Sequence, residues 1–404
     1  MLLNGDRDME IGMEKPQSLR RMLAPFFIAN GFVYGMAALY FSFMPKYLRD
    51  IAGKTDGEIG GLLSVGPLMG IISMIVFGIA ADKAKVKNNV LIFIISVAAV
   101  MFCLINVSGA YIYLMSILAG LMFFLSPCAA LLDAISLEFT TAAGFRYGPM
   151  RIMGSICFGM FSLLLGLALS IFQDYIDVRI IFPSFIVIAA GAIISVKMMP
   201  KVGGHARGKT KAAYKDLFKD KTCITLLIFM FVGHFSFGSY VNFMQNFLAE
   251  TGNPSWVWGL VVFLTIVGEI FFFWKFDYFF RRFTLRQIVV FAAFTKVLRY
   301  ASFAVLPVGL NILITSLLTG SFISVLNYSA AYYINATVSK EIRAFGMTVI
   351  YSVSFFFPRF LAGVFGGLIV QNYGFITLMY ICAAINVLLI LSSKFLTFRE
   401  PVKK

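Results

Sequence analysis

Long apolar runs alternate with short polar breaks along almost the whole chain. A helix needs about 20 apolar residues to cross a hydrocarbon core about 30 Å thick. Twelve runs are long enough, and they predict membrane spans at roughly 24–48, 57–81, 89–107, 110–138, 150–172, 176–198, 222–248, 255–275, 286–305, 308–336, 343–370 and 373–394. The pattern therefore predicts an all-α membrane protein with about twelve transmembrane helices. The first run lacks the small-residue cleavage pattern of a signal peptide, so we expect it to remain as a span.

The two halves of the chain resemble each other at an offset close to 200 residues. Matching positions fall in spans one and seven, four and ten, and two and eight: Tyr40/Tyr240, Phe43/Phe243, Met44/Met244, Leu48/Leu248, Leu118/Leu318, Gly120/Gly320, Ala130/Ala330, Gly61/Gly259 and Gly70/Gly268. Parallel repeats of this kind are a transporter architecture, with the substrate site at the repeat interface. We expect two pseudo-symmetric six-helix bundles at 24–198 and 222–394, a basic linker at 199–221, and tails at 1–23 and 395–404.

The basic residues indicate how the chain is oriented. Of 34 Lys and Arg residues, 27 lie in loops and tails on one side of the predicted spans and four in loops on the other. This positive-inside bias predicts a multi-pass protein of the cell inner (plasma) membrane with both termini cytoplasmic. It also explains the net charge of +15 without nucleic-acid binding. The composition agrees, because only 13% of residues are charged, against about a quarter in soluble domains.

The sequence offers no cluster for a metal or a cofactor. The five cysteines stand singly, and His205 and His234 are the only histidines. Residues 203–210 fit G-x-x-x-x-G-K-[ST] literally, but a phosphate-binding loop lies between a strand and a helix. Here the match falls in the basic linker, so we expect no ATP binding. No nucleophile–base arrangement is present either, and we expect no enzymatic activity.

Ionisable residues inside the predicted spans are the first candidates for function. A charge is costly in a bilayer, so such residues usually face a cavity or one another. They are Asp133, Glu138 and Arg151 in the first half, and His234, Glu269, Lys296, Arg299 and Arg359 in the second. Lys296 and Arg299 are three residues apart and share a helical face. The alternative is a set of structural ion pairs and snorkelling side chains, which explains Glu138 and Arg151 about equally well because both lie near predicted span ends.

A second set of candidates lies at the cytoplasmic ends of the second and eighth spans. Asp82 follows Gly78 and precedes Lys83 and Lys85. An ordinary basic loop would explain the lysines but not Asp82, whereas a carboxylate beside lysines can clamp neighbouring helix ends. A weaker echo follows the eighth span: Asp277, Arg281 and Arg282.

The Gly78–Lys83 segment resembles the signature of the major facilitator superfamily, G-x-x-x-D-[RK]-x-G-[RK]-[RK]. Gly78, Asp82 and Lys83 match, and Lys85 replaces the inner glycine. Together with twelve spans, the repeat and the basic linker, the resemblance covers the whole chain. It implies the major facilitator fold and conformational gating by Gly78, Asp82, Lys83, Asp277 and Arg281.

Around the fourth and fifth spans the chain resembles the branch of lactose permease, its oligosaccharide–proton symporter relatives and the phenylpropionate permeases. These proteins have an acid on span four and a G-x-x-R-x-x-G turn into span five. The matching residues are Asp133 and Arg151, and in the sugar symporters this pair contacts the substrate. Further matches to the branch are Glu269 after Gly268, Arg299 on span nine and Arg359 on span eleven.

The chain departs from the branch at its proton-carrying acid on span ten, since residues 316–336 contain no charge. The carboxylates of span seven are also missing, which leaves His234, Asn242 and Gln245. These gaps argue against galactoside specificity and leave the identity of the coupling carboxylate open.

The sequence thus favours a secondary transporter, with proton-coupled symport of a sugar, a nucleoside or a small carboxylate. We expect Asp133, Arg151, Glu269 and Arg359 to bind the solute, and Glu269, Arg299, Lys296 and His234 to handle the proton. The expected partners are the solute, protons and lipid, with the chain acting as a monomer. A proton-driven exporter of lipophilic compounds stays open, although span five lacks the Gly-Pro motif of antiporters. So does a ligand sensor or scaffold that does not transport.

Overall fold

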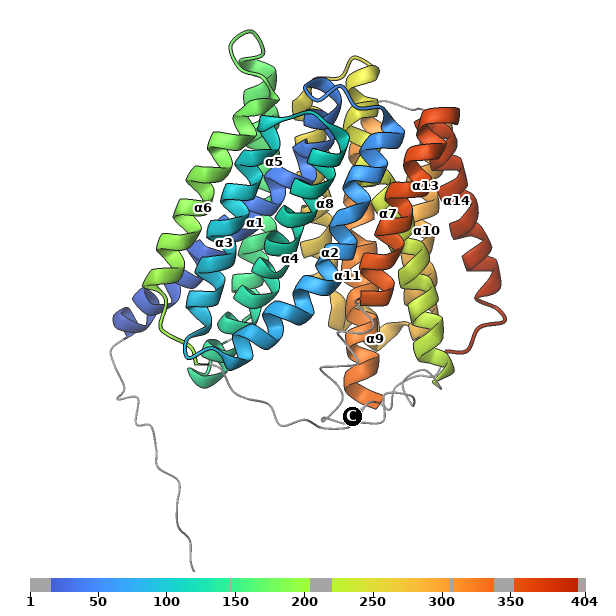
Figure 1. The fold of residues 1–404 in the computed structure, drawn as a ribbon. Helices are drawn as coiled ribbons and strands as arrows, with labels where there is room; N and C mark the ends of the chain where they lie inside the picture. Colours follow the sequence, from blue (N-terminus) through green and yellow to red (C-terminus); the bar gives the residue numbers. More distant parts are fainter. Residues whose placement is uncertain (1–15, 146, 204–219, 306–308, 338–351, 399–404) are drawn as a thin grey trace, which may run out of the picture.

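The computed structural model describes residues 16–145, 147–203, 220–305, 309–337 and 352–398 (Figure 1). These residues form helices joined by short turns and contain no strand, so the expected all-α fold is confirmed. The long helices are α1 (Pro16–Asp50), α2 (Asp56–Lys83), α3 (Lys87–Leu104), α4 (Tyr111–Ala142), α5 (Gly148–Ile171), α6 (Ile181–Met198), α7 (Lys221–Glu250), α8 (Ser255–Trp274), α10 (Leu285–Val305), α11 (Leu310–Thr337), α13 (Phe357–Tyr373) and α14 (Phe375–Ser392). The short ones are η1 (Ile105–Val107), η2 (Val178–Ile180), α9 (Phe276–Arg282) and the π-helical η4 (Ser352–Phe356).

Within the described residues, eleven helices are long and apolar enough to cross a membrane. They match the predicted spans except the ninth, which is α10. Three basic residues, Arg286, Lys296 and Arg299, make α10 less apolar than the others. The helix nevertheless packs against α11 and α14 as part of the bundle. With α10, the described residues contain the twelve long helices that the sequence predicts.

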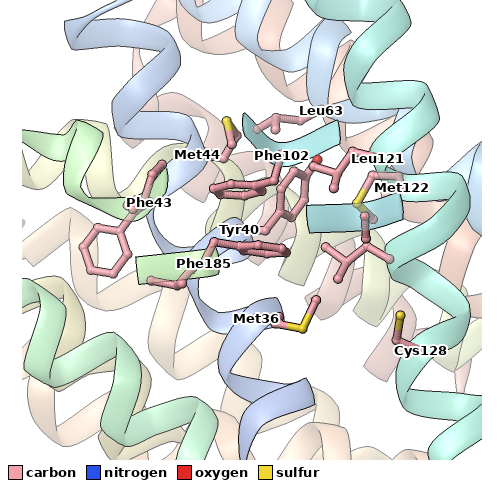
Figure 2. Close-up of a cluster of buried hydrophobic side chains, with 14 of the residues drawn as sticks. Met36, Tyr40, Phe43, Met44, Leu63, Phe102, Leu121, Met122, Cys128 and Phe185 are labelled. Atoms are coloured by element: carbon pink, nitrogen blue, oxygen red, sulfur yellow. The ribbon is translucent and has the colours of Figure 1, made fainter. Parts of the chain in front are cut away.

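Helices α1 to α6, the N-half, surround one apolar core. α1 lies against α5 and α6, while α4 lies against α2 and α3. Figure 2 shows side chains from several of these helices converging, among them Phe102 and Phe185, whose rings stack with centroids 4.0 Å apart. Lipid tails are as apolar as these side chains, so close van der Waals packing, more than exclusion from water, stabilises such a core.

Helices α7 to α14, the C-half, repeat this arrangement. α8 lies against α11, α10 against α11 and α14, and α13 against α7. Corresponding turns even share a conformation: Gly53 after α1 and Gly252 after α7 have φ values of 63° and 75°, a region that favours glycine. The two halves meet along α5 with α8, α2 with α13, and α1 with α7. The expected pair of pseudo-symmetric six-helix bundles is therefore confirmed.

The halves approach most closely at the end that carries the α1–α2 and α7–α8 turns, which we call the sealed end. A Cβ atom on Gly60 of α2 would lie 2.3 Å from the carbonyl oxygen of Gly363 on α13. A Cβ atom on Gly259 of α8 would lie 2.5 Å from the carbonyl oxygen of Ser162 on α5. Both contacts are with backbone and cannot yield easily. Small residues thus let the helix backbones touch, as they often do between membrane helices.

Polar contacts reinforce the sealed end. Arg49 at the end of α1 forms an ion pair with Glu250 at the end of α7. The indole N–H of Trp258 on α8 donates to the backbone carbonyl of Ser42 on α1 at 2.9 Å. Hydrogen bonds of Thr55 and Gly57 with Gln371, and of Trp256 with Ser170, also join the halves at this end.

Within the C-half, α8 and α11 cross at two glycines. A Cβ atom on Gly268 would lie 1.9 Å from the carbonyl oxygen of Leu317, and one on Gly320 would lie 2.1 Å from that of Thr265. The residue after Gly268 is Glu269, so this crossing fixes the backbone that carries a candidate functional carboxylate.

Adding one methyl group at the crossing should destabilise the protein. We expect Gly320→Ala to lower the thermal unfolding midpoint in detergent, because overpacking a tight contact costs about 1–3 kcal/mol. The control is Gly78→Ala on α2, where a Cβ atom would meet nothing within 4 Å. Equal midpoints for the two variants would contradict the backbone contact.

Candidate functional site

Asp133 on α4 and Arg151 on α5 form an ion pair. Nε of Arg151 lies 3.8 Å from Oδ2 of Asp133, and the two side chains stay 39% and 29% exposed. Gly148 and Pro149 begin α5, since proline fits the first turn of a helix, and this places Arg151 in that turn. A cation there opposes the helix dipole. The stability of α5 alone therefore does not explain the arginine, whereas a neighbouring carboxylate does.

Tyr34 on α1 contacts both members of the pair. Its hydroxyl donates to Oδ2 of Asp133 at 3.4 Å, and the guanidinium carbon of Arg151 lies 4.5 Å from the centre of its ring. Gly154 makes room for this ring, because a Cβ atom there would lie 2.5 Å from it. The Tyr147 hydroxyl lies near the same carboxylate. Burial and the Asp133 charge raise the pKa of Tyr147.

Glu269 brings a second carboxylate from the C-half. α8 packs against α5, and the charge of Glu269 interacts with that of Arg151. Among the described residues Glu269 forms no direct ion pair, so its interaction with Arg151 acts at a distance greater than that of a salt bridge. One arginine therefore interacts with two acids that belong to opposite halves. We call Asp133, Arg151 and Glu269 the central cluster.

The structure does not place Arg299 with Glu269, the partner that the sequence suggested. Arg299 is fully buried on α10 and has its own acceptors in the C-half. It donates to the carbonyl of Ile312 at 3.2 Å, to Thr315 Oγ1 at 3.2 Å, to Ser316 Oγ at 3.0 Å and to the Tyr240 hydroxyl. All these acceptors are neutral groups of α7 and α11, so Arg299 ties α10 to both helices.

The remaining candidates of the C-half lie among aromatic rings. Nζ of Lys296 on α10 and the guanidinium carbon of Arg359 on α13 lie 4.6 and 5.2 Å from the centre of the same ring, that of Phe237 on α7. The ring of His234, also on α7, lies 4.8 Å from that of Phe355. We call His234, Lys296 and Arg359 the aromatic cation cluster.

The structure does not join the expected gating residues to one another. Gly78 has open space around its Cα, Lys83 is exposed, and Arg281 is exposed at the end of α9. Neither Asp82 nor Arg281 forms an ion pair within the described part of the chain. The side chain of Asp277 lies outside the described residues.

Two further candidates are placed elsewhere. Glu138, near the end of α4, forms an ion pair with Lys87 at 2.6 Å, which ties α4 to the start of α3. The 203–210 match to a phosphate-binding loop lies almost wholly outside the described residues. No group of three metal-ligating side chains occurs among those that are described.

Tyr34 and Tyr240 are the site residues that the sequence interpretation missed. Each contacts an arginine, yet uncharged residues do not stand out in apolar spans. The repeat offset would have helped, because it pairs Tyr40 with Tyr240 and Tyr34 with His234. Both members of the second pair lie on the first helix of their half, beside a candidate cluster.

Known proteins with similar sequences are transporters. A maltose permease of Geobacillus stearothermophilus is 21% identical over 355 residues, covering 87% of this chain and 89% of the relative. A probable 3-phenylpropionic acid transporter of Escherichia coli (strain K12) is 22% identical over 329 residues, covering 80% of this chain and 84% of the relative.

The fold has a counterpart among solved structures. The nucleoside transporter NupG superposes with a TM-score of 0.80 at 17% identity, covering 93% of this chain and 98% of that one. This likeness shows the fold. A match to the family described as the MFS_1 like family extends over residues 26–381. The resemblance predicted from the sequence is confirmed, and this multi-pass membrane protein belongs to the MFS_1 like family of the major facilitator superfamily.

Proposed function

We propose that the protein is a secondary active transporter that carries a small organic solute across the cytoplasmic membrane in symport with protons. The observation that supports this best is the central cluster, in which Arg151 of the N-half pairs with Asp133 and also interacts with Glu269 of the C-half. In alternating access the two halves rock against each other around a fixed site. Such a movement changes the separation of Glu269 from Arg151 while Asp133 keeps its partner, so Glu269 can exchange its ionic partner for a proton.

The state of the cluster suits solute binding. Asp133 and Arg151 keep 29% and 39% of their side-chain surface exposed, and Glu269 is also partly exposed. A fully packed structural ion pair would be closed to a solute, whereas this one has free hydrogen-bonding capacity. We propose that Asp133 and Arg151 bind the solute and that Glu269 couples it to the proton.

The distribution of basic residues supports an orientation for this state. With both termini cytoplasmic, the sealed end faces outward and the protein is inward-facing. Both halves of the central cluster come from one chain, so a monomer suffices. We propose that neither ATP nor a cofactor takes part and that the protein is not an enzyme.

A thermal-shift screen of the purified protein at pH 6 and pH 8 tests the proposal. Maltose, uridine and 3-phenylpropionate represent the three solute classes, since a ligand selective for the folded state raises the midpoint by mass action. We expect one of them to raise the midpoint and to undergo counterflow in proteoliposomes. Asp133→Asn and Arg151→Ala should each remove both effects, whereas Asp177→Asn, in an exposed pair with Arg179, should remove neither.

The same experiment separates the rival functions. Binding without counterflow would favour a sensor or scaffold over a transporter. A panel without any stabilising compound would rule out these three solute classes and would favour export of lipophilic compounds. A retained response in Asp133→Asn would show that the central cluster is not the binding site.

A further inference from the structure

The aromatic cation cluster holds two basic side chains, Lys296 and Arg359, that form no ion pair with an acid among the described residues. Lys296 is fully buried, and its Nζ has no hydrogen-bond partner among the described residues. It lies over aromatic faces, with the ring centres of Phe322 and Phe237 at 4.3 and 4.6 Å. A ring face attracts a cation but offers no oxygen acceptor. The cost of keeping an ammonium group away from water is therefore only partly offset.

Arg359 repeats this situation from another helix. Its guanidinium carbon lies 4.0 Å from the ring centre of Phe355 and 5.2 Å from that of Phe237. Its Nε is buried without a hydrogen-bond partner in the described structure. Neither Arg359 nor Lys296 forms an ion pair with any acid among the described residues. Two basic side chains therefore approach one ring, that of Phe237, with no described acid paired to either.

Arg299 shows that the fold can satisfy a buried cation where the role is structural. It lies three residues after Lys296 on α10 and is equally buried. Its two terminal nitrogens donate to four oxygen acceptors on α7 and α11, and only its Nε lacks a partner among the described residues. The lack of acceptors around Lys296 is therefore not a general property of this helix. It is a local feature of the cluster.

We propose that the aromatic cation cluster binds the carboxylate of the transported solute, which is an organic monoanion with an apolar body. That this solute is transported rests on the function proposed above. A carboxylate supplies oxygen acceptors for Nζ of Lys296 and Nε of Arg359, which have none among the described residues. Contacts of this kind between charged partners are stronger than neutral hydrogen bonds. The rings of Phe237, Phe322 and Phe355 supply an apolar wall for the body of the molecule.

The exposure of the cluster indicates the order of contact. Arg359, Phe237 and Phe355 remain partly exposed, while Lys296 and Phe322 are fully buried behind them. An anion therefore meets Arg359 before Lys296. The central cluster, with two acids and one base, does not attract an anion in this way, so the carboxylate end of the solute goes to the aromatic cation cluster.

Titration calorimetry on the purified full-length protein tests the inference. It compares the binding of 3-phenylpropionate with that of its neutral analogue 3-phenylpropanamide. We expect the amide to bind at least about tenfold more weakly, because only the carboxylate can form charge-assisted contacts. Lys296→Gln and Arg359→Gln should each weaken carboxylate binding about tenfold and leave binding of the amide unchanged. The matched control is Lys275→Gln, which removes an exposed lysine that also lies over a ring, that of Trp274 at 4.3 Å.

The comparison of acid and amide on the unaltered chain needs no variant, and Lys296→Arg, which keeps the charge, should retain carboxylate binding. Three results would each overturn the inference. The first is equal affinity for acid and amide, and the second is unchanged affinity in both glutamine variants. The third is no binding of 3-phenylpropionate, benzoate or octanoate. Selective carboxylate binding without counterflow would keep this site and refute the proposed transport. Counterflow of maltose or uridine without carboxylate binding would support the proposed transport and refute this site.

Discussion

Glu269→Gln is expected to abolish accumulation driven by a pH gradient while counterflow of the same solute stays within a few-fold of the unaltered protein. Counterflow needs only solute binding and alternating access, which Asp133 and Arg151 can still support. Accumulation against a gradient needs a group that changes its protonation state between the two conformations. Within the central cluster, Glu269 is the acid that can part from Arg151 when the halves move. Radiolabelled solute uptake into proteoliposomes, with and without an imposed pH gradient, measures both activities.

A matched control is available on α2. Glu58 is the third residue of its helix and completes a capping box with Thr55. Glutamine serves at this position as well as glutamate, so Glu58→Gln removes an exposed carboxylate at little structural cost. Both activities should survive in this variant. Full pH-driven accumulation by Glu269→Gln would show that another group carries the proton.

Gly60→Ala is expected to break the transport cycle by preventing closure of the sealed end. The added Cβ atom would lie 2.3 Å from the carbonyl oxygen of Gly363 and 2.8 Å from Cα of Gly367, both backbone atoms of α13. A clash of about 1–3 kcal/mol acts only in the closed state. It therefore shifts the conformational equilibrium toward the open state on the order of tenfold or more. Counterflow should fall in proportion, and distances between spin labels on the α1–α2 and α7–α8 turns should lengthen.

The neighbouring residue provides the control for this variant. A Cβ atom on Gly61 would meet the hydroxyl end of Tyr111, a side chain of the same half that can rotate away. Gly61→Ala should therefore leave both the label distances and counterflow close to those of the unaltered protein. Unchanged label distances in Gly60→Ala would show that the contact of α2 with α13 accepts the added methyl group, which would contradict this prediction.

The spans could be predicted because a bilayer demands about 20 apolar residues in each helix. This length requirement does not determine where a helix begins or ends outside the hydrocarbon core. α1 begins at Pro16, well before the predicted start at 24, since a helix can continue beyond the apolar run. The π-helical turn η4 before α13 also left no mark in the hydrophobic pattern, because it changes the winding of the backbone and not the polarity of its residues.

The residues of the site could be predicted from the sequence, but which of them interact with one another could be predicted less well. Charges inside spans drew attention to Asp133, Arg151 and Glu269, and the structure brings these three near one another. Sequence spacing shows which residues share a helix face but not which helix lies opposite. α8 packs on α5, so Glu269 faces Arg151, whereas Arg299 turns toward α7 and α11. Only the packing of the helices could settle that choice.

The hydrogen bond of Trp258 to Ser42 has a practical consequence. The chain has three tryptophans, and two of them, Trp256 and Trp258, lie on the first turn of α8 at the sealed end. Trp258 is 2% exposed and its indole N–H bonds across the two halves, while Trp274 is 74% exposed at the other end of α8. Separation of the halves breaks that bond and changes the polarity around the indole. The protein therefore contains its own optical reporter, and its native ultraviolet emission can follow the conformational cycle without any attached dye.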